Sequence, residues 1–536
     1  MIALLRQRLR RDGMQLLLWF LGAVLLAVAG YGGVTQSYAT VADRQEVLTA
    51  VMANLVILLF RGLPSGTSEG AFFAFEDLPW LAMLAGLMST FLAVRHTRGD
   101  EEAGRGELLA ATPAGRAVPL LATIVHGLAA DVVLGALVAG ALLPTGFDAA
   151  GSLVTGAATA GAGIAFLGVG LVAAQLARTS RGANALSVWV LVAAFLIRGI
   201  GNVAGTPSDD LARIDSSWVA WLSPFGWAEQ ARPYDEDAVW PVLLAVGVGL
   251  LLAGASFALQ SARDIGAGFV PERRGRANAG PLLTSPFALV WRLSWGAIVG
   301  WIVGGGITGI LATTLSGLAG EISGQNPAVQ EILEKIATAG GIDETVITVF
   351  FTVLGILAAC AAVQTIARAR QDEAHGTAEL VRAAAVGRVR WLADYVVVAT
   401  CAVVLVTAAA VLAAFAGLAS TDADPELYRV TIVTALGQFV AASVFTGITA
   451  AVFALLPRAT IGAGWAFVGV ATVLGLFGPL FGMPEWATHA SPFAVTPVVA
   501  NGEADLRGVW WLVAVAAGSY AAALTLMRRR ELASGG

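Results

Sequence analysis

Apolar stretches of about 20 residues recur along this chain of 536 residues, and we count twelve of them. A helix satisfies its backbone hydrogen-bonding groups within its own segment, and about 20 apolar residues are enough to cross the hydrocarbon core of a bilayer. The alternation expected of barrel strands is absent. We therefore predict an all-α polytopic membrane protein. The predicted spans lie near residues 14–34, 79–95, 119–143, 152–177, 184–203, 240–260, 294–314, 346–367, 392–417, 430–456, 461–481 and 508–527.

The composition agrees with a membrane protein, because only 13% of the residues are charged, against roughly a quarter in an ordinary soluble domain. Mean hydropathy is +0.76. Both cysteines, Cys360 and Cys401, fall inside predicted spans, so we expect neither a disulfide framework nor a metal site from them. Membrane lipid is the expected surrounding, and no nucleic-acid partner is expected.

Charge alternates between successive loops, and this alternation predicts the topology. Arginines gather in the N-terminal segment and in every second loop, whereas acidic residues such as Asp209, Asp210 and Asp215 gather in the others. Cationic loops stay on the cytoplasmic side of a membrane. We therefore expect both termini in the cytoplasm.

The polar segment 98–116 recurs 272 positions later as 370–388, with nine of nineteen aligned positions identical. The basic-acidic-aliphatic triplet Arg263-Asp264-Ile265 also has a counterpart in Arg530-Glu531-Leu532. An even number of spans in each copy gives both copies the same orientation. We therefore predict two parallel six-helix repeats. The predicted domains are a first transmembrane half (1–265), a cytoplasmic linker (266–284) and a second transmembrane half (285–536).

The repeated segment joins the second and third spans of each half, and its pattern predicts a short helix on the cytoplasmic surface. Acidic residues at its start suit a helix N-terminus, Gly104 introduces a break, and Pro113 ends the helix. The second copy departs from this pattern, because Ala374 and Ala385 replace Glu102 and Pro113. We expect the second helix to bind a partner more weakly or to end differently.

The pattern Glu-Glu-x-x-Gly-x-x-Glu-Leu-Leu-x-x-x-Pro, followed by Gly-Arg, resembles the cytoplasmic loop of ABC exporter permeases of the second type. In that family a short coupling helix docks into a cleft of the ATP-binding subunit. The tandem twelve-span form is similar to the permeases of polyketide and tetronasin-type antibiotic exporters. The resemblance implies a transport subunit in a bacterial plasma membrane that exports an antibiotic, drug or other amphipathic small molecule.

The same resemblance implies which residues couple the chain to its ATPase. The alternative is that the arginines only enforce topology while the glutamates solvate a loop. The expected coupling residues are Glu101, Glu102, Gly104, Glu107, Leu108, Arg116, Glu373, Gly376, Glu379, Leu380 and Arg388.

No Walker A pattern is present, and Lys335 is the only lysine in the sequence. The chain is therefore expected to have no catalytic residue and no cofactor of its own. ATP and Mg²⁺ are expected in a separate ABC ATPase subunit, in two copies, one beneath each half.

His126 and Asp131 fall inside the third predicted span, where a charged group is costly and marks a candidate substrate path. A structural role for Asp131 is the alternative. An ion-coupled secondary transporter with these residues as its proton site is the second interpretation of the chain. A membrane-embedded enzyme lacks the clustered polar set that it would need.

The apolar segment 49–63 and the amphipathic segment 326–337 follow the first span of each half. Both are expected as helices on the outer face, with a re-entrant helix as the alternative for 49–63. They would act either as a lid or as an anchor at the membrane surface. Arg198 closes the fifth span beside Asn202, and we expect it to reach water.

Overall fold

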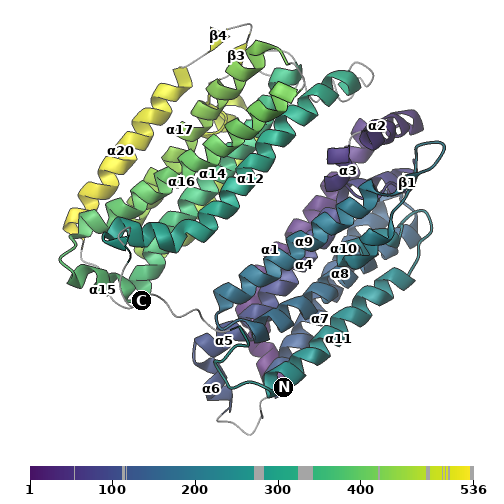
Figure 1. Cartoon of the computed structure of the whole chain (residues 1–536), viewed down its shortest axis with the longest axis horizontal. Helices are drawn as coiled ribbons and strands as arrows, with labels where there is room; N and C mark the ends of the chain where they lie inside the picture. The colour runs from purple at the N-terminus through teal and green to yellow at the C-terminus, as the bar shows by residue number, and fades with distance from the viewer. Residues whose placement is uncertain are drawn as a thin grey trace. The chain divides into compact units, whose positions relative to one another are not determined.

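The computed structural model describes residues 1–53, 55–110, 115, 117–270, 280, 283–323, 342–420, 423–477, 483–497, 499–500, 503–504 and 507–530. The chain forms two compact units, Met1–Arg274 and Gly275–Gly536. Each unit is a bundle of long helices (Figure 1).

The first unit contains α helices, short 3₁₀ turns and one antiparallel ribbon that pairs β1 with β2. Its elements are α1 (Ile2–Ser37), α2 (Val41–Ala53), α3 (Leu55–Phe60), α4 (Glu69–Arg95), α5 (Arg98–Glu102), α6 (Arg105–Ala110), α7 (Ala117–Leu142), α8 (Ala149–Leu176), α9 (Ser180–Val203), β1 (Thr206–Pro207), β2 (Ile214–Asp215), α10 (Pro224–Gln230) and α11 (Trp240–Ser261).

The second unit also consists mainly of α helices and has one antiparallel ribbon, which pairs β3 with β4. Its elements are α12 (Pro286–Ser323), α14 (Ile342–Ala374), α15 (Thr377–Ala383), α16 (Arg388–Ser420), α17 (Pro425–Leu455), α18 (Thr460–Thr472) with a π-helical turn after it (Val473–Phe477), α19 (Glu485–Thr488), β3 (Val499–Ala500), β4 (Glu503–Ala504) and α20 (Arg507–Arg529).

Among the described residues, 12 helices are long and apolar enough to cross a membrane. They are α1, α4, α7, α8, α9 and α11 in the first unit, and α12, α14, α16, α17, α18 and α20 in the second. The prediction of an all-α protein with twelve membrane-spanning helices is confirmed.

The fourth span lies at the centre of each bundle. In the first unit α8 packs against α4, α7, α9 and α11, and in the second unit α17 packs against α14, α16, α18 and α20. The first span packs against the second and third in both units. The two units therefore share one pattern of helix neighbours.

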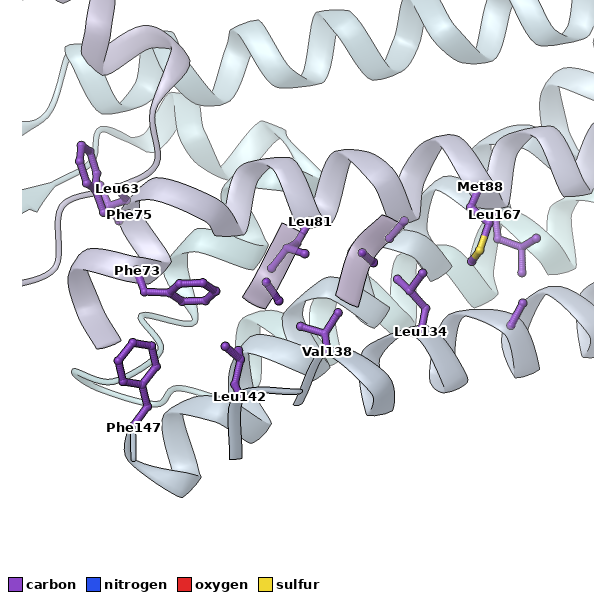
Figure 2. Packing of buried hydrophobic residues seen from close by; sticks show 14 of the residues in the cluster. Leu63, Phe73, Phe75, Leu81, Met88, Leu134, Val138, Leu142, Phe147 and Leu167 are labelled. Carbon is purple, nitrogen blue, oxygen red and sulfur yellow. The ribbon is translucent and has the colours of Figure 1, made fainter. Parts of the chain in front are cut away.

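Apolar side chains fill the space between α4 and α7, as Figure 2 shows. Leu81 and Met88 of α4 lie opposite Leu134 and Val138 of α7, and all four are buried. Because lipid tails are as apolar as leucine, close packing rather than water expulsion holds such helices together.

Glycine allows α7 and α8 to approach each other backbone to backbone. A Cβ added at Gly135 would overlap the carbonyl oxygen of Gly156, and one added at Gly156 would overlap the carbonyl oxygen of Gly135. At this pair, the small residues let the two helix backbones come into direct contact.

The segment 49–63, predicted as an outer-face or re-entrant helix, contains the end of α2 and all of α3. These are two short helices that are not among the twelve spans. The matching segment 326–337 and most of the predicted linker 266–284 lie outside the described residues. The lid and anchor interpretations therefore remain predictions.

Candidate coupling site

The first repeated loop folds into two short helices, α5 and α6, joined by a turn at Gly104. Gly104 has φ +70°, a left-handed conformation that glycine adopts without the steric cost of a side chain. The break predicted at this glycine is present in the structure.

The second repeated loop has the same turn but a longer preceding helix. Gly376 has φ +74°, and α15 begins directly after it, whereas α14 runs without interruption to Ala374. Ala369 and Gln371 stand where the first copy has Thr97 and Gly99, and both are better helix formers than the residues they replace. The span therefore continues through the segment that forms α5 in the first copy.

Each loop presents a Glu-Leu pair to its surroundings at the same position of the motif. Leu108 on α6 is 73% exposed and Leu380 on α15 is 76% exposed. Glu107 and Glu379, which precede them, are exposed as well. An exposed leucine beside a carboxylate, repeated in both copies, has the chemistry of a docking surface with an apolar anchor and a polar rim.

Glu101 does not project from the first loop, because arginines of the same unit bind it. Arg98 donates a 2.8 Å hydrogen bond to it, and Arg263, which follows the last span of the unit, donates bonds of 2.6 and 3.0 Å. Arg98 also donates to the carbonyl oxygen of Ala174 at the end of α8, at 3.0 Å. Glu101 therefore fastens the loop to the ends of the fourth and sixth spans.

Glu373 has the same arrangement in the second unit. Arg530, directly after α20, donates a hydrogen bond to Glu373, and Arg370 lies 3.7 Å from its other oxygen. Arg530 also donates to the carbonyl oxygen of Phe453 at the end of α17, at 2.8 Å, and its guanidinium lies over the Phe453 ring. We call these two sets of contacts the Glu101 brace and the Glu373 brace.

A family model described as "Multidrug efflux system permease Rv1217c, C-terminal domain" matches residues 4–259 and 283–528 of the chain. The chain is 33% identical over 540 residues to the "Multidrug efflux system permease protein Rv1217c" of Mycobacterium tuberculosis strain H37Rv. That match covers 99% of this chain and 95% of the relative.

The chain belongs to this family of multidrug efflux permeases. It is a multi-pass membrane transport permease, and the match agrees with the resemblance to ABC exporter permeases seen in its loops.

Two further loop residues of the permease contact their own unit. Glu102 accepts a 2.9 Å hydrogen bond from the backbone N–H of Ser180 at the start of α9. Ala374 stands at the matching position of the second copy and offers no carboxylate for such a bond. Arg388 donates to the carbonyl oxygen of Arg530 at 2.7 Å, whereas Arg116 and Pro113 lie outside the described residues.

The structure gives His126 and Asp131 of the permease separate partners. The Nε2 atom of His126 lies 3.0 Å from a carboxylate oxygen of Asp12, on the first span. Asp131 accepts a 2.5 Å hydrogen bond from Ser89 on the second span and is fully buried. Each residue therefore connects two spans of the first unit.

The expectation that Arg198 reaches water is wrong, because the side chain is fully buried. It donates a 2.5 Å hydrogen bond to Glu229 of α10, which also accepts from Asn202 at 2.8 Å. Arg198 also donates to the carbonyl oxygens of Leu59 and Arg61. Burial raises the pKa of Glu229, and Arg198 counteracts part of that rise.

Sequence analysis identified the repeated basic-acidic-aliphatic triplets as marks of the repeat, but it did not predict that Arg263 and Arg530 bind the loop glutamates. The sequence does carry a signal for these contacts, because the glutamate and the arginine of the first half both recur at matching places in the second half. Glu229 carried no such signal, because its two partners, Arg198 and Asn202, come from α9, and no repeated motif joins α9 to α10.

Proposed function

We propose that this permease is the membrane subunit of an ATP-driven ABC exporter that moves an antibiotic, drug or other amphipathic small molecule outward. Two copies of a separate ABC ATPase bind ATP and Mg²⁺ and dock on the two loops. This chain itself contributes no catalytic residue. Both loops and both termini face the cytoplasm of a bacterial plasma membrane.

The observation that carries the proposal is the exposed Glu-Leu pair repeated in the two loops. Topology alone requires positive charge on an inner loop, and it does not require an exposed leucine at the same motif position in both copies. Leu108 and Leu380 would enter the ATPase cleft, while Glu107 and Glu379 would face basic or polar groups at its rim.

The braces provide a route from the docking helices to the spans. A force on α6 passes through Glu101 to Arg263 and Arg98, and so to the ends of α11 and α8. A force on α15 passes through Glu373 to Arg530. In this proposal Glu101 and Glu373 transmit movement, whereas the Glu-Leu pairs make the contact with the ATPase.

Transport measurements distinguish the proposal from an ion-coupled transporter. Vesicles that contain the permease and its copurified ATPase are expected to export an amphipathic dye with ATP, and a protonophore is expected to leave that export unchanged. Export that persists without ATP and stops when the proton gradient collapses would contradict the proposal and favour the second interpretation.

Docking is tested by replacing both exposed leucines with aspartate. The double variant Leu108→Asp/Leu380→Asp is expected to lose at least tenfold in ATPase retention, which corresponds to about 1.4 kcal/mol, while the permease stays folded. Leu211→Asp is the matched control, because Leu211 is an exposed leucine remote in sequence from both loops. Full retention of the ATPase by the double variant would contradict docking at these helices.

A further inference from the structure

Three side chains that can bind a metal ion lie close together in the first unit, and none of them belongs to the exposed Glu-Leu pair. Asp12 comes from α1, His96 follows the end of α4, and His126 comes from α7. All three are buried, and their candidate ligand atoms lie within 4.8 Å of one another. Three spans therefore meet at one small polar centre.

The two imidazoles point their Nε2 atoms at the same carboxylate oxygen of Asp12. His126 Nε2 lies 3.0 Å from Asp12 Oδ2, and His96 Nε2 contacts the same oxygen. The ring centroids are 5.5 Å apart, with planes at 82°. In a tetrahedral zinc site with bonds of about 2.0–2.1 Å, ligand atoms lie about 3.3 Å apart, so only a small outward shift is needed to admit an ion.

The surroundings of His96 favour a cation on its Nε2 atom. Its Nδ1 atom lies 3.6 Å from Asp100 Oδ2 and has no hydrogen-bond partner among the described residues. If a neutral His96 used its single proton to bind Asp12, the Nδ1 lone pair would face the Asp100 carboxylate. A metal on Nε2 places the proton on Nδ1, directed at that carboxylate, which is the common outer-shell arrangement of a metal-bound histidine.

Asp12 has an oxygen available for such a site. Its Oδ1 atom lies 3.3 Å from Arg95, whose side chain is one-third exposed, and Oδ2 is the atom that both histidines approach. A cavity of about 60 Å³ borders His96, Thr97 and Asp100. This volume has room for a water molecule beside His96 and Asp100.

We propose that Asp12, His96 and His126 bind one divalent transition-metal ion, with Zn²⁺ as the committed occupant. The ion ties the cytoplasmic ends of the first three spans together beneath the first loop. Arg368 and Val398 stand at the positions of His96 and His126 in the second copy, so the site belongs to the first half alone. This proposal is independent of how transport is driven.

Metal content of the full chain in lipid nanodiscs tests the proposal. Wild-type protein purified without chelator is expected to carry about one zinc per chain, and His126→Ala is expected to lose it. His375→Ala is the matched control, because His375 is exposed and lies in the second unit, and it is expected to keep the metal.

A second measurement avoids dependence on the folding of His126→Ala. Chelator-treated wild-type protein is titrated with Zn²⁺, and its melting temperature is expected to rise as the ion saturates the site. Co²⁺ in place of Zn²⁺ is expected to give the visible absorption of a tetrahedral site. The proposal is overturned if wild-type protein carries no zinc and its melting temperature does not respond to Zn²⁺, or if His375→Ala loses as much metal as His126→Ala.

Discussion

Glu373 accepts a hydrogen bond from Arg530, which lies 157 residues later in the sequence. The first unit has the same relationship between Glu101 and Arg263, which are 162 residues apart. In both units the glutamate lies near the end of the second span, and the arginine lies within two residues of the end of the sixth. The loop motif is therefore joined to the last helix of its own bundle.

The Glu373 brace is expected to stabilise the second unit. The Glu373 side chain is 2% exposed and that of Arg530 is 11% exposed, so removing one partner leaves a charge with little access to water. Arg530→Gln and Glu373→Gln are each expected to cost about 3 kcal/mol in free energy of unfolding. The double variant is expected to cost less than the sum, since neither charge remains unpaired. Denaturant unfolding in detergent measures all three.

Arg529→Gln is the control for the brace, because Arg529 is exposed at the end of the same helix. Its effect is expected to stay within about 0.5 kcal/mol. Strict additivity of the two single variants would show that Glu373 and Arg530 do not act as a pair.

The turn at Gly376 is expected to require glycine. With φ +74°, an alanine there adopts a left-handed conformation that costs roughly 1–2 kcal/mol. Gly376→Ala is therefore expected to lower the melting temperature and weaken ATPase retention. Gly387→Ala in the same loop is the comparison, because Gly387 has open space around it and does not have a positive φ. Equal melting temperatures for the two variants would contradict this role.

The hydropathy of the chain was sufficient to predict the helical class and the twelve spans, because crossing a bilayer imposes both length and composition. The loop turns were also predictable, since a glycine recurs at the same place in both motifs. Gly104, where the pattern predicts a break, and Gly376 at the matching place both have a left-handed conformation.

The partners of charged residues were not predictable from the pattern. Arg198 lies near the end of a span, which suggested access to water, but α10 folds back and places Glu229 against it. Asp12, His96 and His126 lie on three separate spans, so no sequence motif joins them. Such contacts depend on the packing of whole helices, which local periodicity does not specify.

The buried pair of Arg198 and Glu229 is expected to respond asymmetrically to substitution. Arg198→Met removes the counter-charge of Glu229, but the buried carboxyl can then take up a proton, because burial raises its pKa, so the change is expected to cost less than about 3 kcal/mol. Glu229→Gln leaves the fully buried Arg198, which cannot lose its charge, without its counter-charge and is expected to cost about 3–5 kcal/mol. Unfolding of the two variants at neutral pH measures the difference, and equal losses would contradict it.

The raised pKa of Glu229 also fixes the sign of a pH effect. Above its usual value of 4.5, the unfolded chain releases the proton while the folded protein still holds it. Folded protein then binds more protons, so this group's contribution to stability falls as pH rises from 4.5 to the folded pKa. The stability difference between Glu229→Gln and wild type is therefore expected to shift in favour of the variant across that window. A difference that is independent of pH would show that Glu229 does not titrate there.

The contact between α7 and α8 predicts opposite effects for two glycine-to-alanine changes. Alanine is the better helix former by about 1 kcal/mol, so Gly140→Ala, at a position with open space, is expected to stabilise the permease or leave it unchanged. Gly156→Ala forces its methyl group against the carbonyl oxygen of Gly135 on the facing helix, which is expected to cost about 1–3 kcal/mol. Because backbone atoms cannot move aside as a flexible side chain does, the helices themselves must separate. Melting temperatures in the same detergent compare the variants, and a stable Gly156→Ala protein would show that the two helices do not approach this closely.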